Sequence, residues 1–183
     1  SIEEIAKTIK EEIKEVMDRV REIVERDERE IKKVKEEVDR IAKRNEDEIR
    51  KVKDELDKKV KSDRLERLRD KLRKVEEDSR ESLKDVRRKL EEVRRESDEV
   101  VRDVERRLEE VLREVEDVLR KRLPEEAMKE VADRVRKKLE EIERTLEEVH
   151  RKSRKVLTEI IKKLKENHDR SKELLDRIRE EVK

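Results

Sequence analysis

The side chains that could do chemistry recur in small sets along the chain. Asp27, Ser97, His150 and Ser153 are the residue types of a nucleophilic triad, in which histidine takes a serine proton and a carboxylate orients the imidazole. Two other requirements of that chemistry are missing. N–H groups inside a helix are already bonded and cannot form an oxyanion hole, and a closed helical core offers no substrate cleft. We therefore expect no enzyme and no catalytic residue.

The two histidines also make a poor metal site by sequence spacing. His150 and His168 are 18 positions apart, which on one helix separates them by about 27 Å. Each histidine then has at most one carboxylate at its own level along the helices, whereas zinc sites use three or four protein ligands. We expect no metal and no cofactor, unless several copies of the chain assemble around one ion.

Composition excludes further classes of function. The 183 residues include 57 Lys+Arg and 56 Asp+Glu, one Pro, and no Gly, Cys, Phe, Trp or Tyr. Thiolate chemistry, phosphate-binding glycine loops and base-stacking platforms are therefore absent. The charges alternate in sign, so no basic stripe indicates a nucleic-acid or membrane partner. Runs of consecutive apolar residues are at most two residues long. We therefore expect a soluble chain with no membrane span and no signal peptide, and the sequence indicates no particular cellular location.

Apolar residues repeat every 18 positions, which is five turns of an α-helix. The stripe therefore stays on one face of a straight helix, unlike a heptad stripe, which imposes a left-handed supercoil. A stripe this narrow is stable only against partner helices. Three of the repeating sets are Ile13, Ile31 and Ile49; Leu65, Leu83, Val101 and Leu119; and Leu139, Leu157 and Leu175.

The stripe breaks twice. The step from Leu56 to Leu65 moves the apolar side to the opposite face, and Asp63 with Glu66 has capping-box spacing, which places a turn at Ser62. Pro124 suits a helix start and marks the second break. The sequence predicts an all-α fold: one straight, antiparallel, up-down-up three-helix bundle over residues 1–183, with helices at about 2–60, 64–122 and 125–182.

Some positions at the centre of the stripes are polar. In antiparallel helices, facing residues have numbers whose mean is the residue number of the turn. The polar positions of the first two predicted helices pair with a mean of 62, and those of the last two with a mean of 125, close to the predicted turns. Two polar layers are therefore expected, one of Asp27, Ser97, His150 and Ser153, the other of Asn45, Ser79, Asn167, His168 and Ser171. The equivalent layer of Ile9, Val115 and Val135 is apolar. Buried polar groups must be paired, and such pairing can fix helix register.

The pattern resembles de novo designed helical bundles that contain buried hydrogen-bond networks. The resemblance covers the whole chain and rests on the 18-residue stripe, the Glu, Lys and Arg surface, and the repeated Ser, Asn and His layers. The lack of glycine in the loops departs from it. The resemblance implies a structural scaffold with no natural activity, substrate or required partner.

Two alternatives stay open. Protonation of the buried histidines would make the bundle pH-responsive. Apolar residues at the stripe margins could widen the core or form a seam for another copy or a designed helical partner; they are Val24, Val100, Leu112, Val118 and Ile161.

Overall fold

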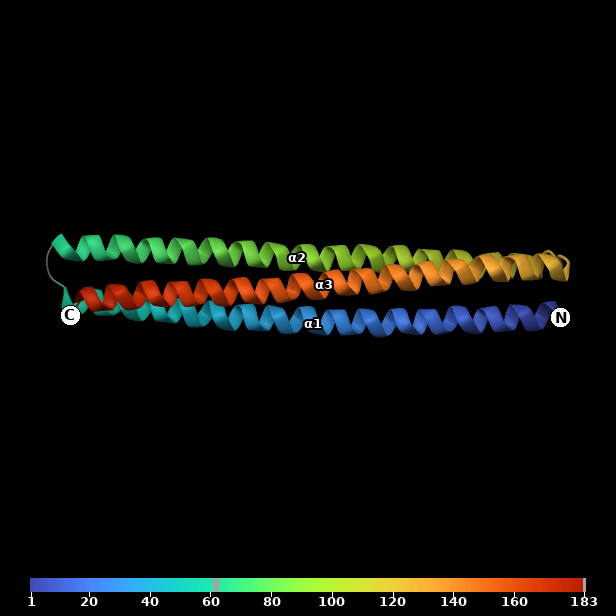
Figure 1. The fold of residues 1–183 in the computed structure, drawn as a ribbon, viewed down its shortest axis with the longest axis horizontal. Helices are drawn as coiled ribbons and strands as arrows, with labels where there is room; N and C mark the ends of the chain where they lie inside the picture. Colours follow the sequence, from blue (N-terminus) through green and yellow to red (C-terminus); the bar gives the residue numbers. More distant parts are fainter. Residues whose placement is uncertain (61–62, 183) are drawn as a thin grey trace. The chain divides into compact units, whose positions relative to one another are not determined.

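The computed structural model describes residues 1–60 and 63–182. It contains three helices, α1 (Ile2–Lys59), α2 (Asp63–Arg120) and α3 (Glu125–Val182), drawn in chain order from blue to red in Figure 1. Every pair of helices is in contact, and no strand occurs within the described ranges. The predicted all-α three-helix bundle is confirmed. The straightness of the helices stays a prediction.

The helix boundaries follow the predicted ones to within one residue, except at the end of α2. This helix ends at Arg120, two residues before the predicted end, because Arg122 has a left-handed φ of 52°. The N–H of Leu123 donates to the carbonyl of Val118, and that of Arg122 to Leu119, both at 3.3 Å. These bonds form a Schellman motif, in which glycine is the usual left-handed residue. Arg122 thus adopts the left-handed backbone conformation that glycine usually adopts in this motif, and its backbone is strained.

The helix starts agree with the capping signals that the structure describes. Ser1 Oγ accepts the N–H of Glu4 at 3.3 Å, and the Glu4 carboxylate lies 3.8 Å from the Ser1 amino group, as a capping box requires. Pro124 stands just before α3, and its carbonyl accepts the N–H of Met128 at 3.4 Å. The predicted turn at Ser62 lies outside the described residues.

The chain divides into two compact units. Unit 1 comprises Ser1–Glu30 with Val93–Arg154, and unit 2 comprises Ile31–Glu92 with Lys155–Lys183. Each unit contains one segment of every helix. That all of 1–183 forms a single domain stays a prediction.

Ion pairs give the helix directions within the units. In unit 1, Glu12 of α1 pairs with Arg136 of α3 and Arg19 pairs with Glu143, so α1 and α3 run parallel there. In unit 2, Asp39 pairs with Arg87 and Asp57 with Arg69, so α1 and α2 run antiparallel. These directions are those of the predicted up-down-up topology.

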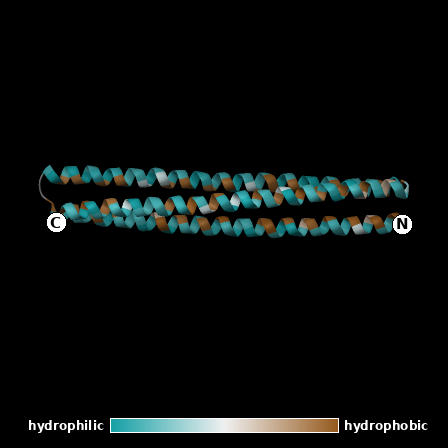
Figure 2. Cartoon of the chain, in the orientation of Figure 1, coloured by the Kyte–Doolittle hydropathy of each residue, from teal (hydrophilic) through white to brown (hydrophobic). Residues whose placement is uncertain are grey.

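Each unit has its own apolar core beneath a charged surface, and brown apolar residues recur along mainly teal helices in Figure 2. In unit 1 the layer of Ile9, Val115 and Val135 is fully buried. Of the predicted margin residues, Val118 is buried and the others are half-buried. The core of unit 2 includes Val52, Leu56, Leu68, Leu72, Val75, Leu175 and Ile178.

The helices carry too many charges to hold a membrane-spanning stretch anywhere in the described ranges.

Candidate functional site: two polar clusters

The polar cluster of unit 1 is centred on an aspartate–histidine pair. Asp27 of α1 has a side chain only 5% exposed, and His150 of α3 lies beside it with 20% exposure. His150 Nδ1 is 2.6 Å from Asp27 Oδ1, a short, charge-assisted contact. The parallel course of α1 and α3 brings these two side chains together, as their shared predicted layer requires.

The two serines of this layer are buried but do not join the pair. Ser97 and Ser153 are 8% and 6% exposed. Among the described residues, neither hydroxyl has a hydrogen bond to Asp27 or His150. The four-residue network stays a prediction.

Glu30 is a member of this cluster that the sequence analysis missed. One ligand atom each from Asp27, Glu30 and His150 lies within 4.8 Å of the others. The count of at most one carboxylate per layer was therefore wrong. Glu30 follows Asp27 by three residues, and that spacing on a helix was the available signal. Glu30 lies beside the stripe, and its own ion pair is to Arg154, with Oε1 3.9 Å from Nε.

The polar cluster of unit 2 is built around one amide. Asn45 of α1 donates through Nδ2 to Ser79 Oγ of α2 at 2.9 Å. Ser171 of α3 donates its hydroxyl to Asn45 Oδ1, also at 2.9 Å. Both ends of the amide are thus used, and a single buried side chain bonds the other two helices. Three of the five predicted residues of this layer are brought together.

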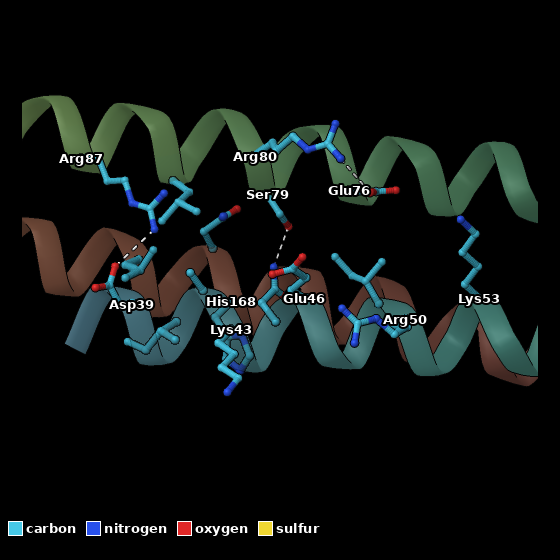
Figure 3. Close-up of a pocket in the computed structure, with 17 residues that line it drawn as sticks. Asp39, Lys43, Glu46, Arg50, Lys53, Glu76, Ser79, Arg80, Arg87 and His168 are labelled. Carbon is cyan, nitrogen blue, oxygen red and sulfur yellow. Dashed lines mark hydrogen bonds and ion pairs between the residues drawn. The ribbon is translucent and has the colours of Figure 1, made fainter. Parts of the chain in front are cut away.

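The remaining two, Asn167 and His168, line a pocket beside the amide. Both are half-buried, and His168 Nδ1 is buried with no hydrogen-bond partner among the described residues. The pocket has a volume of about 520 Å³ and also includes Asn45 and Ser79. Figure 3 shows, as a dashed line, the hydrogen bond that Ser79 Oγ accepts from Asn45.

Charged side chains surround this pocket. Arg87 and Asp39 form an ion pair across α2 and α1 at 3.2 Å, and Arg80 pairs with Glu76 at 3.0 Å within α2 (Figure 3). These exposed pairs contribute little to stability, about 0–1 kcal/mol each. The pocket is therefore lined by neutral polar, apolar and oppositely charged side chains.

Further along unit 2, one carboxylate has a perturbed pKa. A hydrogen bond from Lys71 holds the pKa of Glu181 below its ordinary value of 4.5, although partial desolvation opposes the shift. The Lys71 Nζ to Glu181 Oε1 distance is 2.9 Å, which joins α2 and α3. The shift identifies a structural ion pair, away from both polar clusters.

The two clusters offer different chemistry. The Asp27–His150 pair can hold a proton or a cation, whereas the Asn45 cluster holds fixed hydrogen bonds between neutral groups.

No protein-family model matches the chain, and comparisons with curated proteins and with solved structures found no similar protein.

Proposed function

We propose that the chain is a designed structural scaffold without a natural biochemical activity, and that its polar clusters set the register of the three helices. The observation that carries this proposal is the Asn45 amide, which bonds to Ser79 and Ser171 at the same time. Directional bonds to two helices from one buried group constrain both helices relative to the third.

Apolar packing alone specifies register weakly in such a bundle. The stripe of α2 offers apolar residues one turn away on both sides of Ser79, at Val75 and Leu83. A slip by one turn would therefore keep apolar contacts but place an apolar side chain opposite the Asn45 amide. The unpaired amide would cost about 1–3 kcal/mol, which disfavours the slipped arrangement.

The apolar layer of unit 1 supports the same reasoning. Ile9, Val115 and Val135 occupy equivalent stripe positions and have no exposed surface. An apolar layer therefore packs well in this repeat, and burial does not require a polar one. What the polar layer adds is a preferred pairing between particular residues.

The test replaces the polar layer of unit 2 with apolar residues. The parent chain should give one backbone amide signal per non-proline residue in a ¹H–¹⁵N NMR spectrum. The triple variant Asn45→Leu, Ser79→Ala, Ser171→Ala should remain helical but show additional or broadened signals from slipped arrangements.

The conservative variant Ile9→Val is the control, because it alters the apolar layer without removing a hydrogen bond. It should keep one set of signals. A single, sharp set from the triple variant would contradict the proposed role of the polar layer.

A second candidate function, a pH-responsive bundle, is favoured by the buried, unpartnered Nδ1 of His168. Protonation there adds a charge without a hydrogen-bonded carboxylate, whereas protonated His150 would face Asp27. Charged groups of all three helices line the pockets around His168. From α1 they are Glu37, Asp39, Arg40, Lys43, Arg44, Glu46, Arg50 and Lys53; from α2, Glu76, Arg80 and Arg87; from α3, Lys165 and Asp169.

Thermal unfolding at pH 7.5 and pH 5 tests this candidate. Acid should lower the midpoint of the parent chain, and His168→Asn should reduce that loss more than His150→Asn does. An equal or higher midpoint in acid would remove the second candidate and leave the first unaffected.

A further inference from the structure

We propose that Asp27, Glu30 and His150 form a binding site for one divalent transition-metal ion in unit 1. The three residues each offer a ligand atom, and these atoms lie within 4.8 Å of one another. The inference does not depend on the proposed function, because a scaffold with or without register-setting layers can hold this ion.

The backbone places the ligands on adjoining faces. Asp27 and Glu30 are three residues apart on α1, so their side chains leave the same side of the helix. His150 approaches from the parallel helix α3, with Nδ1 2.6 Å from Asp27 Oδ1. Metal–ligand bonds of about 2.0–2.2 Å in a tetrahedral site keep neighbouring ligand atoms about 3.3–3.6 Å apart. Small rotations of the three side chains therefore suffice to surround an ion.

The three ligands differ in burial, so one is held rigidly while the other two are reachable from solvent. The Asp27 side chain is 5% exposed and is held within the bundle, whereas His150 and Glu30 are 20% and 29% exposed. An ion can therefore reach the site from solvent without opening the core. Three protein ligands also leave a coordination position for water, as in open zinc sites.

The ligand types select the class of ion. Mg²⁺ and Ca²⁺ prefer oxygen ligands alone, whereas an imidazole with two carboxylates suits Zn²⁺, Co²⁺ and similar ions. The negative charge of the two carboxylates also attracts a dication. The guanidinium of Arg154, 3.9 Å from Glu30, is the competing cation. Binding at Nδ1 requires the histidine tautomer whose proton is on Nε2.

The test uses Co²⁺ and Zn²⁺ as probes with the full chain. Titration should show one saturable Co²⁺ site per chain by visible absorption, and Zn²⁺ should displace the Co²⁺. The ¹⁵N signal of His150 Nδ1 should shift on Zn²⁺ binding, while that of His168 should not. His150→Ala and Glu30→Gln should each weaken binding by about tenfold or more, since each removes a direct ligand.

Two matched variants control for charge and for the presence of histidine. Glu28→Gln removes an exposed carboxylate two residues from Glu30, and His168→Ala removes the histidine one repeat away; both should bind Co²⁺ like the parent. Circular dichroism without metal checks that every variant is folded, and Glu30→Gln tests the site even if His150→Ala unfolds.

Three results would overturn the assignment: no saturable binding, binding that Glu30→Gln and His150→Ala leave unchanged, or equal losses in the control variants. The last result would indicate scattered carboxylate binding over the charged surface.

Discussion

Replacing Asn45 by alanine removes both hydrogen bonds that centre on its amide. Ser171 is 4% exposed, so its hydroxyl would be left buried and unpaired, at a cost of about 1–3 kcal/mol. Ser79 lines the pocket, where water can take over its lost bond at a cost of about 0–2 kcal/mol. The two costs together predict that Asn45→Ala lowers the free energy of unfolding by about 1–5 kcal/mol.

Urea unfolding followed by circular dichroism at 222 nm measures this loss. In the triple variant Asn45→Leu, Ser79→Ala, Ser171→Ala, no polar partner is left unpaired. That variant should be at least as stable as the parent chain. A loss below about 0.5 kcal/mol for Asn45→Ala would place it within the range of ordinary surface changes and refute the reasoning. So would an equal loss in the triple variant.

Two serines on α3 provide an internal control. Ser171→Ala leaves Asn45 Oδ1 without its donor and should cost about 1–3 kcal/mol. Ser153→Ala, one repeat earlier and equally buried, removes no bond to Asp27 or His150 and should cost less. Equal losses would mean that burial, rather than the bond to Asn45, sets the energy.

Three further predictions concern the turn, the cores and an ion pair. Arg122→Gly should raise the free energy of unfolding, measured by urea unfolding, by about 0.5–1 kcal/mol, because the left-handed strain that glycine relieves exceeds the conformational entropy that glycine loses on folding. A lower free energy of unfolding would contradict this. In the same assay Ile13→Ala should cost about 2–5 kcal/mol and Ile31→Ala less, since Ile13 is buried and Ile31 half-buried; the reverse order would be inconsistent with these cores. The pKa of Glu181 is lowered by Lys71, so its contribution to stability is present above pH 4.5 and is lost as pH falls through the lowered pKa. Glu181→Gln should therefore destabilise the chain at pH 7 but not at pH 2 in thermal melts, and an equal effect at both would contradict the pairing.

The 18-residue spacing was sufficient to predict the three helices. It gives the angular position of every residue, and the breaks at residue 62 and Pro124 divide the stripe into three segments. The end of α2 was predicted two residues late, because the sequence has no glycine to mark the left-handed residue that Arg122 provides. A turn without the usual residue gives no local signal of its conformation.

The polar contacts were predictable only in part. Spacing assigned Asp27 and His150 to one layer and Asn45, Ser79 and Ser171 to another, and the structure has contacts between Asp27 and His150 and from Asn45 to both serines. Which groups then bond depends on side-chain rotamers and helix separations, and angular position fixes neither. A carboxylate that is already in short hydrogen-bond contact with an imidazole does not need a serine hydroxyl.

Glu30 could not be identified from the sequence for a different reason. It lies outside the apolar stripe among many other surface glutamates, so composition gave no reason to single it out. Only the position of His150 on the neighbouring helix distinguishes it from Glu28, two residues earlier.

The pocket beside Asn45 also provides a place for an optical reporter. The chain has no aromatic residue, so one introduced tryptophan would be its only indole fluorophore. Leu83 is half-buried and lines the pocket of about 520 Å³, which has room for an indole. The emission of Leu83→Trp would follow the opening of unit 2 alone, while circular dichroism follows the helices of both units.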